Sequence, residues 1–278
     1  MRLGDLEIHF LNDGTFKLDA GPVFGIVPKA LWERECQCDA RNRVTLALTV
    51  PLIRTGSHNI LLDCGIGRKW SAKQRDIYAI EEHPNLLDSL AQAGLKPADV
   101  TIVFHSHLHH DHTGWNTQLN GKGEAEPVFV NARHIIHKIE LENVHHPNEI
   151  QRGTYLAANI APIDASGGWD VFEYPREVAP GITVFHTGGH TAGHAAVRIE
   201  SGGQAALFMA DIFPTITHRH LPWITAYDEY PLDTLEVKRR LFRECVEHNS
   251  LVLLNHDPSA CAVRLKPQGE KFEALKEC

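Results

Sequence analysis

The sequence predicts an α/β fold in which helices and β-strands form layers. Three apolar runs have the length of buried strands and end in polar residues: 59–63 (NILLD), 101–106 (TIVFHS) and 251–255 (LVLLN). Before the third of these runs, apolar residues at helical spacing predict a long helix at 232–248. Strands and helices in this mixture are typical of a layered α/β domain with its functional site at the strand ends. The 278 residues, 43% of them hydrophobic, are enough for a single domain over 1–278.

Further strands and helices are expected along the chain. Strands are expected at 6–11, 44–54, 169–174, 182–186, 195–200 and 204–210. Helices are expected at 84–93, 131–142 and 148–158. Asn85 or Pro84 can start the first of these helices, and Gly94 ends it. The stretch 20–43 is long, apolar and irregular, as arm-like segments often are, and it is our reason to expect a homodimer.

The charge and the hydropathy pattern narrow the range of partners. The chain has 27 Lys and Arg against 35 Asp and Glu, a net charge of −8. We therefore expect no nucleic-acid partner, and a small neutral substrate rather than a polyanion. The first ten residues, MRLGDLEIHF, lack the basic and apolar regions of a signal peptide, and no apolar run is long enough to span a membrane. A cytoplasmic location and no membrane partner are expected.

The cysteines show no metal-binding or disulfide pattern, because no CxxC pair occurs among them. We expect all of them to be free thiols in a reducing compartment. They are Cys36, Cys38, Cys64, Cys245, Cys261 and Cys278.

A cluster of histidines carries the strongest chemical signal. Residues 107–112 read HLHHDH, an HxHxDH pattern that comes directly after the expected strand 101–106. On a turn after a strand, His107 and His109 can point to one side, and Asp111 and His112 to another. Neutral imidazoles and a carboxylate are the ligands that zinc accepts.

Three more candidate ligands lie after later strands. His190 stands in the glycine-rich segment 187–194, where glycines let the backbone turn tightly. Asp211 ends the apolar run ALFMAD, and His256 follows LVLLN. A buried strand that ends in an unpaired Asp or His is costly unless that group is bound to something. With the four candidates of the HxHxDH segment these make seven ligands, which suits two metal ions that share one carboxylate.

In their order along the chain, these motifs resemble those of the metallo-β-lactamase superfamily, which implies an αββα sandwich and a hydrolase. The matching residues are Asp63, His107, His109, Asp111, His112, His190, Asp211 and His256. By this resemblance, the ligands of the first metal ion are His107, His109 and His190. Those of the second are Asp111, His112 and His256. The resemblance also implies that Asp211 bridges the two ions and that Asp63 supports the histidine loop without being a ligand. The implied cofactor is two Zn²⁺ per chain, with Mn, Fe or Co as alternatives.

Three segments resemble a narrower group, the YtnP-like quorum-quenching lactonases, which are related to N-acyl-homoserine lactonases and to methyl parathion hydrolase. The segments are 23–32, 186–194 (HTGGHTAGH) and 209–231. The resemblance implies that a lactone ester, in particular an N-acyl-homoserine lactone, is opened by a hydroxide that bridges two metal ions. It also implies that Asp111 orients this nucleophile and passes a proton to the leaving alkoxide.

One position departs from the lactonase pattern. Many acyl-homoserine lactonases have a substrate-contacting tyrosine three residues after the bridging Asp, where this chain has Pro214. His218, His220 or Tyr227 can take its place, and the sequence does not choose among them. Aromatic residues that can line a pocket for an acyl chain are Phe24, Trp32, Trp115 and Trp223.

Other functions stay open at this stage. The same two-metal centre suits a phosphotriesterase or arylesterase. A glyoxalase II-like thioesterase is a further alternative, but the tail from Arg264 onward is short for the C-terminal helical region of that enzyme. A metal-dependent sensor without turnover would be favoured by a missing ligand, and none of the seven is missing.

Overall fold

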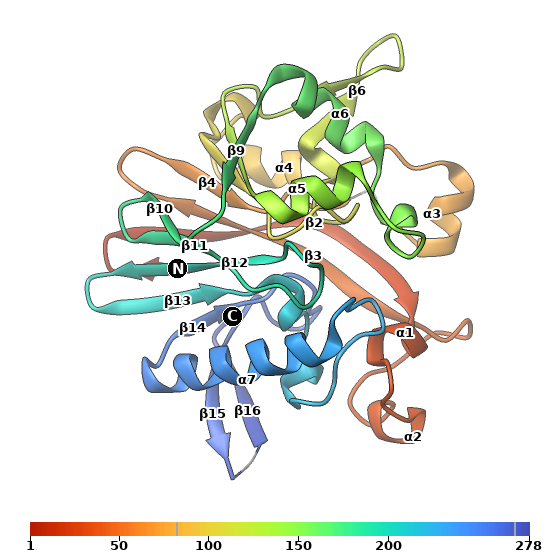
Figure 1. Cartoon of the computed structure of the whole chain (residues 1–278), viewed down its shortest axis with the longest axis vertical. Coiled ribbons are helices and arrows are strands. Elements are labelled where there is room, and N and C mark those ends of the chain that lie inside the picture. The colour runs from red at the N-terminus through yellow and green to blue at the C-terminus, as the bar shows by residue number, and fades with distance from the viewer. Residues whose placement is uncertain (82, 270) are drawn as a thin grey trace.

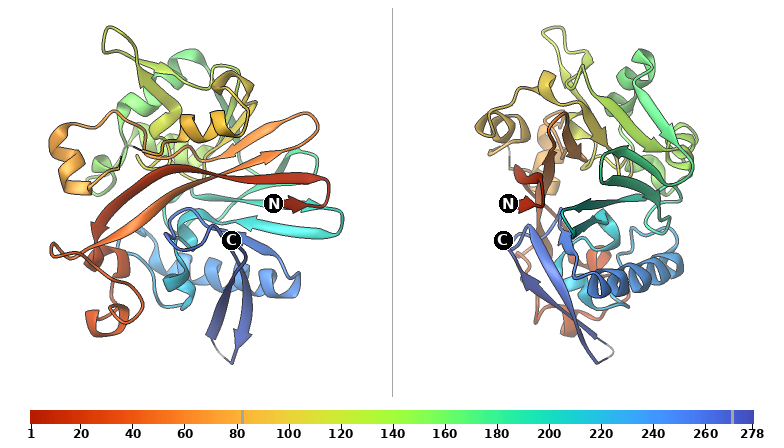
Figure 2. Two further views of the ribbon diagram at one scale, coloured as in Figure 1. Left: turned by 180° about the vertical axis from the view of Figure 1, so that it is seen from behind. Right: turned by 90° about the vertical axis from the view of Figure 1, so that its left-hand side faces the viewer.

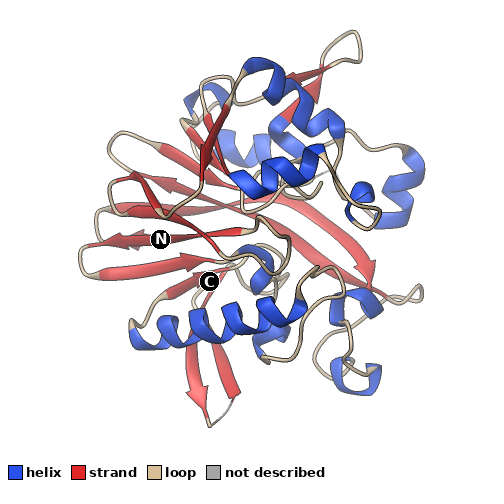
Figure 3. Ribbon diagram, in the orientation of Figure 1, coloured by secondary structure: helices blue, strands red, loops and turns tan. Residues whose placement is uncertain are grey.

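The structure, a computed structural model, describes residues 1–81, 83–269 and 271–278. Two β-sheets lie face to face in it, and helices cover the outer side of each sheet (Figures 1 and 3). The longer helices on one side are α4 (Leu86–Gln92), α5 (Lys138–His145) and α6 (Ala157–Ser166). The opposite side is covered by α7 (Pro231–Glu247). This αββα sandwich confirms the predicted fold class.

The first sheet combines an antiparallel half and a parallel half. Within the described residues it has seven strands, in the spatial order β1 (Arg2–Leu3), β2 (Leu6–Asp19), β3 (Arg43–Arg54), β4 (Asn59–Leu62), β5 (Ile102–Phe104), β8 (Arg133–His137) and β9 (Trp169–Phe172). Neighbours from β1 to β4 are antiparallel, and those from β4 to β9 are parallel. The parallel strands are joined by crossover connections that place helices on the outer face.

The second sheet is mostly antiparallel. In the described part of the chain it also has seven strands, in the order β10 (Arg176–Ala179), β11 (Ile182–His186), β12 (Ala195–Ser201), β13 (Gln204–Phe208), β14 (Leu251–Leu253), β15 (Ala262–Gln268) and β16 (Lys271–Lys276). The parallel pair β13–β14 is joined through α7. A separate small hairpin is formed by β6 (Thr117–Leu119) and β7 (Ala125–Pro127).

Side chains from both sheets form the central core. On β12, Ala195 and Val197 point into this core, whereas Ala196 between them points outward to the cluster under α7. The alternation follows from the two-residue period of a strand. Ile8 and Ile53 enter the same core from the first sheet. Each such side chain contributes roughly 1.5–3 kcal/mol by leaving water.

The outer helices bury one face each. Helix α7 packs Leu241, Phe242 and Cys245 against the second sheet. Helix α4 packs Leu86 and Leu90 against the first sheet. The two clusters are separate from the central core, so the molecule has three apolar layers between its four layers of secondary structure.

Helix α4 begins and ends where the sequence predicts. The Asn85 side-chain oxygen accepts hydrogen bonds from the N–H groups of Leu87 (3.0 Å) and Asp88 (3.1 Å). Such a cap stabilises a helix by about 1 kcal/mol. Gly94, with a φ of +78°, follows the helix and turns the chain away.

Short helices complete the fold. They are α1 (Ala20–Phe24), α2 (Lys29–Trp32) and α3 (Ala72–Tyr78). Single 3₁₀ turns are η1 (Pro97–Asp99), η2 (Gly114–Asn116), η3 (Gln151–Gly153), η4 (Ala210–Ile212) and η5 (Ile216–Arg219). The segment 20–43 is thus not wholly irregular, as α1 and α2 lie within it.

Two of the helix predictions are wrong in part. The range 131–142 holds strand β8 before helix α5 begins at Lys138. Strand β8 pairs with β5 and β9 on both sides, so sheet hydrogen bonding overrides the local helical pattern. The range 148–158 holds the turn η3 and only the first two residues of α6, which starts at Ala157.

The C-terminal region also differs from expectation. The run 251–255 is followed by the hairpin of β15 and β16, which the sequence analysis missed (Figure 2). Cys261 and Cys278 form a disulfide, so the expectation of free thiols is wrong for these two residues. The pairing of β15 with β16 brings the last residue back to Cys261, with a Cα–Cα distance of 5.6 Å that suits a disulfide. The free cysteines are Cys36, Cys38, Cys64 and Cys245.

Among the helices in the described ranges, none is both long enough and apolar enough to cross a membrane.

Candidate metal centre

The candidate ligands follow the carboxyl ends of strands in both sheets. The segment 107–112 comes after β5, and His190 comes after β11. Asp211 follows β13, and His256 follows β14. Because β13 and β14 are parallel neighbours, their carboxyl ends meet at one edge of the sheet. The strand ends of the two sheets together bring close side chains that are up to 149 residues apart in the sequence.

Three histidines form the first group, which we call the histidine trio: His107, His109 and His190. One ring nitrogen from each lies within 4.8 Å of the others. His190 Nε2 is 3.3 Å from His109 Nδ1, and His107 Nε2 is buried with no hydrogen-bond partner in the described part of the chain. Ring nitrogens that converge in this way, one of them without a hydrogen-bond partner in the described residues, fit a metal ion.

The second group contains Asp111, His112 and His256. The Nε2 atoms of the two histidines are 3.2 Å apart. Asp111 Oδ2 lies 3.7 Å from His112 Nε2 and 3.6 Å from His256 Nε2. One carboxylate and two imidazoles again make a donor set that zinc accepts.

Asp211 stands between the two groups. Its Oδ2 is 3.4 Å from His190 Nε2, and its Oδ1 is 3.4 Å from both His112 Nε2 and His256 Nε2. Each carboxylate oxygen therefore faces a different group, as a bridging ligand requires. The side chains of Asp111 and Asp211 are 11% and 14% exposed, so the centre meets solvent at its carboxylates.

The electrostatics of the cluster also fit a metal. Burial holds the pKa of His107 and of His109 well below the usual value, so both rings are neutral and keep a lone pair for an ion. Burial opposes protonation of His112 too, but Asp211, Asp111 and Asp63 outweigh it and raise the pKa of His112 to about 10. A bound cation can replace this proton, because metal ligands must be deprotonated.

Asp63 forms hydrogen bonds to His112, in the histidine segment 107–112, and to Ser106 just before it. Its Oδ2 is 2.9 Å from His112 Nδ1 and accepts from the hydroxyl of Ser106 at 2.7 Å, and its Oδ1 accepts from the backbone N–H of Ser106 at 2.7 Å. Ser106 Oγ is in turn 2.9 Å from His107 Nδ1. Such partners fix the orientation of metal-binding imidazoles.

Two further supports were missed by the sequence analysis. Asp228 Oδ1 is 3.0 Å from His190 Nδ1, and Asn255 Nδ2 donates to Asp211 Oδ1 at 2.9 Å. Asp228 lies 38 residues after His190 in an acidic loop, so no local pattern connects the two. Asn255 is adjacent to His256, and its place at a strand end was the available signal.

The aromatic candidates for substrate binding form a buried stack. Phe24 lies between Trp32, with ring centroids 5.0 Å apart, and His218, at 5.5 Å. Trp223 meets the Phe24 ring edge-on at 5.9 Å. Phe24 and Trp32 are 1% and 2% exposed, so they are core residues of this region. Trp115 belongs to a different cluster, under α4.

The polar candidates differ in what they contact. His218 Nε2 is 3.0 Å from the carbonyl oxygen of Val23, and its Nδ1 is 2.7 Å from Thr215 Oγ1, so both ring nitrogens are engaged. His220 Nε2 is 2.9 Å from a carboxylate oxygen of Glu35. Tyr227 is 36% exposed. Burial, followed by the charges of Tyr78 and Asp111, raises the pKa of Tyr227 to about 12, so its hydroxyl keeps its proton.

An aromatic group next to Asp111 was also missed. The ring of His110 lies 5.0 Å from that of Trp70 and 5.7 Å from that of Tyr78. His110 Nδ1 is 3.4 Å from Asp111 Oδ1. Trp70 lies just before helix α3 and Tyr78 is the last residue of that helix, so this segment places two aromatic rings against His110, the neighbour of Asp111.

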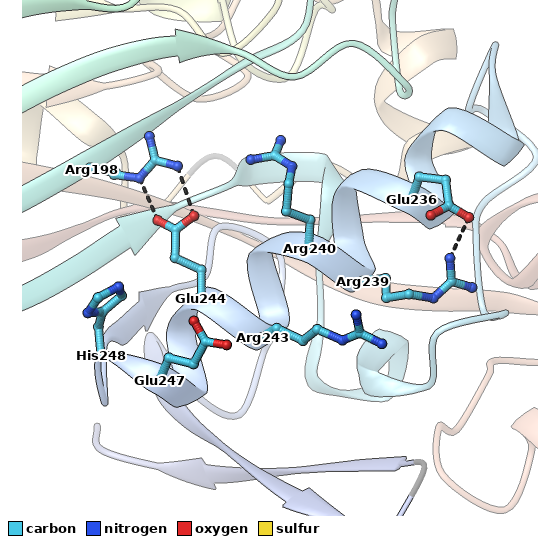
Figure 4. A pocket seen from close by; sticks show the side chains of 8 residues that line it. All are labelled: Arg198, Glu236, Arg239, Arg240, Arg243, Glu244, Glu247 and His248. Carbon is cyan, nitrogen blue, oxygen red and sulfur yellow. Dashed lines mark hydrogen bonds and ion pairs between the residues drawn. The ribbon is translucent and has the colours of Figure 1, made fainter.

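A separate surface pocket of roughly 600 Å³ lies along α7, away from the metal ligands (Figure 4). Its arginines are partly neutralised by neighbouring glutamates. Arg198 forms a two-pronged ion pair with Glu244, and Arg239 pairs with Glu236. The second pair has an exposed glutamate, and such surface pairs contribute little to stability. None of the candidate ligands lines this pocket.

The profile of the metallo-beta-lactamase superfamily matches residues 49–244, which is more than half of the chain. The chain belongs to this superfamily. As a metallo-beta-lactamase superfamily member with a cluster of His and Asp side chains at its strand ends, it is a metal-dependent hydrolase.

Relatives of this superfamily member include lactonases. An N-acyl homoserine lactonase of Rhizobium radiobacter, AttM, is 27% identical over 93% of this chain and 95% of its own length. An N-acyl homoserine lactonase of a Bacillus species is 27% identical over 179 residues. The matched part is 63% of that relative's length.

Solved structures share the whole fold. A probable metal-dependent hydrolase from Staphylococcus aureus is 35% identical and superposes with a TM-score of 0.92, covering 100% of this chain and 99% of its own. The dizinc quorum-quenching lactonase AidC, in complex with its product, is 21% identical with a TM-score of 0.82 and covers 100% of this chain and 96% of its own. At that identity the second likeness shows the fold alone.

Proposed function

We propose that this chain opens the ester ring of lactones, with N-acyl-homoserine lactones as its substrate class, at a centre of two zinc ions. The observation that carries the proposal is the double cluster of ligands with Asp211 between its halves. The lactonase names of the relatives, and the dizinc description of one structural neighbour, support the choice of substrate and metal.

The residues of the centre divide the chemistry among them. Two bound zinc ions would supply hydroxide near neutral pH and would polarise the lactone carbonyl. Asp111 can orient the attacking water through one carboxylate oxygen. The same carboxylate can then carry a proton to the alkoxide that leaves when the ester C–O bond breaks. Its partial exposure beside the ligands suits this role.

Tyr227 is the group we propose to contact the substrate carbonyl, in place of the tyrosine that is absent at Pro214. Among the three polar candidates, His218 and His220 already have protein partners for the ring nitrogens described above. The loop that carries Tyr227 is tied to the metal cluster, because its neighbour Asp228 bonds His190. Its hydroxyl keeps a proton to donate to a developing oxyanion.

The substrate is proposed to be neutral with an apolar tail. The chain has a net charge of −8, which disfavours anionic substrates. The half-buried rings of Tyr78 and His110 next to Asp111, with the buried ring of Trp70 packed against both, offer an apolar surface for an acyl chain. Of the aromatic residues that the sequence predicted, we propose that Trp223 also contacts the acyl chain. Phe24 and Trp32 are buried and form the packing against Trp223.

The experiment is a series of kcat/KM measurements on the zinc-loaded protein. Substrates are acyl-homoserine lactones of increasing chain length, simple γ- and δ-lactones, paraoxon, an aryl ester and a glutathione thioester. Lactones should be preferred, and kcat/KM should rise with chain length until the apolar surface is filled, at about 0.8 kcal/mol for each buried methylene. If paraoxon, the aryl ester or the thioester exceeds every lactone by about tenfold or more, that is roughly 1.4 kcal/mol, the lactonase proposal is wrong.

A further inference from the structure

Glu140 is a fully buried carboxylate outside the set of candidate ligands. It lies in the first turn of α5 and is 0% exposed. Three donors surround it: Oε1 accepts from the backbone N–H of Leu108 (2.9 Å) and the hydroxyl of Tyr155 (3.1 Å), and Oε2 accepts from the hydroxyl of Thr191 (2.6 Å). A buried carboxylate is costly to the fold unless donors of this kind compensate for lost water.

Every one of these contacts flanks a member of the histidine trio. Leu108 stands between His107 and His109, and Thr191 directly follows His190. The Tyr155 ring lies 5.5 Å from the ring of His109. In the described part of the chain, the Glu140 carboxylate makes no hydrogen bond to Asp111, His112 or His256, the members of the other group.

The loop of His190 also packs directly on the backbone of Glu140. A Cβ atom at Gly193 would lie 2.1 Å from the Glu140 backbone nitrogen, so only glycine fits there. The first turn of α5 therefore lies between the loop after β5 and the loop after β11, and the Glu140 side chain accepts hydrogen bonds from both loops.

We propose that Glu140 is a positioning residue that fixes these two loops relative to one another and so sets the affinity of the metal position formed by the histidine trio. The inference rests on the proposed two-metal centre. In this proposal Glu140 affects only the metal position of the histidine trio and not the other one. A general contribution to folding would affect both metal positions.

The test is a zinc titration of the metal-free protein by calorimetry. The variants are Glu140→Leu, which removes the acceptor and keeps the volume, and Glu142→Leu, a matched control at an exposed position of the same helix. His190→Ala identifies the trio's binding event, because it removes one of the three ligands. Glu140→Leu should weaken that event about 10–100-fold, as loss of a support for metal ligands typically does, and should leave the other event unchanged. Glu142→Leu should bind both ions as the wild type does.

A second variant covers the case in which Glu140→Leu does not fold. Thr191→Val keeps the shape of the side chain and removes one of the three donors. It should weaken the same event by about tenfold or less. Equal weakening of both events, or of neither, in the folded variant would overturn the inference. If the wild-type protein binds no zinc, the proposed function falls as well. If the wild type binds two ions and both variants match it, the inference about Glu140 alone is wrong.

Discussion

His190 shows how a single side chain depends on partners that the sequence does not reveal. Its Nδ1 is 3.0 Å from Asp228, while its Nε2 faces His109 and Asp211. Asp228 is itself held by hydrogen bonds from Thr225 and Thr234. The carboxylate therefore fixes the ring orientation and tautomer that leave Nε2 free for a metal.

Asp228→Ala should lower the affinity of the trio's metal position by about 10–100-fold, because the imidazole of His190 loses its orientation. Zinc titration of the metal-free protein measures this change. Asp233→Ala, at an exposed aspartate on α7, is the control and should bind zinc normally. Unchanged affinity in Asp228→Ala would show that packing alone orients His190.

Tyr227→Phe should lower kcat/KM for the preferred lactone by about a hundredfold, as loss of one donor to an oxyanion does. Its metal content should stay at the wild-type value, because Tyr227 is not among the candidate ligands. Tyr230→Phe, in the same loop and 45% exposed, is the control. Wild-type kcat/KM in Tyr227→Phe would remove this residue from the proposed mechanism.

The individual residues that could be predicted from the sequence are those that stand in local motifs directly after a strand. The structure brings the seven candidate ligands of 107–112, His190, Asp211 and His256 together, because each of these segments follows a strand. Asp228 and Glu140 were not found, since only the tertiary fold places them beside the ligands. The roles of the seven candidates as metal ligands, and of Asp228 and Glu140 as residues that position them, remain predictions for the experiments above.

Among the elements, buried strands with apolar runs were the most predictable. The strands of the second sheet from β11 to β14 lie close to their expected positions. Strand β8 was taken for the start of a helix because its few residues carry no two-residue alternation: four consecutive side chains are buried. In a parallel strand covered on both faces, periodicity does not distinguish strand from helix.

Helix α7 provides a test of the packing of an element. Phe242 is fully buried, with its ring 4.8 Å from that of Phe213 and 5.1 Å from that of Phe272. Phe242→Ala should lower the free energy of unfolding by about 3–5 kcal/mol, through lost transfer energy and a cavity. Leu232→Ala, at a position 76% exposed at the start of the same helix, should change it by less than about 0.5 kcal/mol. Denaturant unfolding compares the two, and a similar small loss in both would contradict the described packing.

In the whole molecule, the two sheets bring loops from distant segments to one edge. The sequence predicted the αββα sandwich from the order of its motifs, whereas it missed the hairpin of β15 and β16 and the disulfide between Cys261 and Cys278. The hairpin pairs adjacent segments, but these strands lack the continuous apolar runs that marked the strands of the core. A single domain, a homodimer and a cytoplasmic location remain predictions.

Metal removal should destabilise the molecule as a whole, because ions bound only by the folded state stabilise it. A chelator should lower Tm by at least about 5 °C relative to the zinc-loaded protein, and added zinc should restore it. Differential scanning calorimetry with and without chelator measures the change. An identical Tm in both conditions would mean that the ligand cluster binds no metal in the folded protein.

The most direct test of the two-metal centre is elemental analysis of the wild-type protein and Asp211→Ala, with lactone turnover measured on the same samples. Asp233→Ala serves as a control for removal of an aspartate. The account predicts about two ions per wild-type chain and loss of metal from both positions in Asp211→Ala, together with loss of turnover, because the shared ligand is gone. Two fully occupied positions in Asp211→Ala would contradict it.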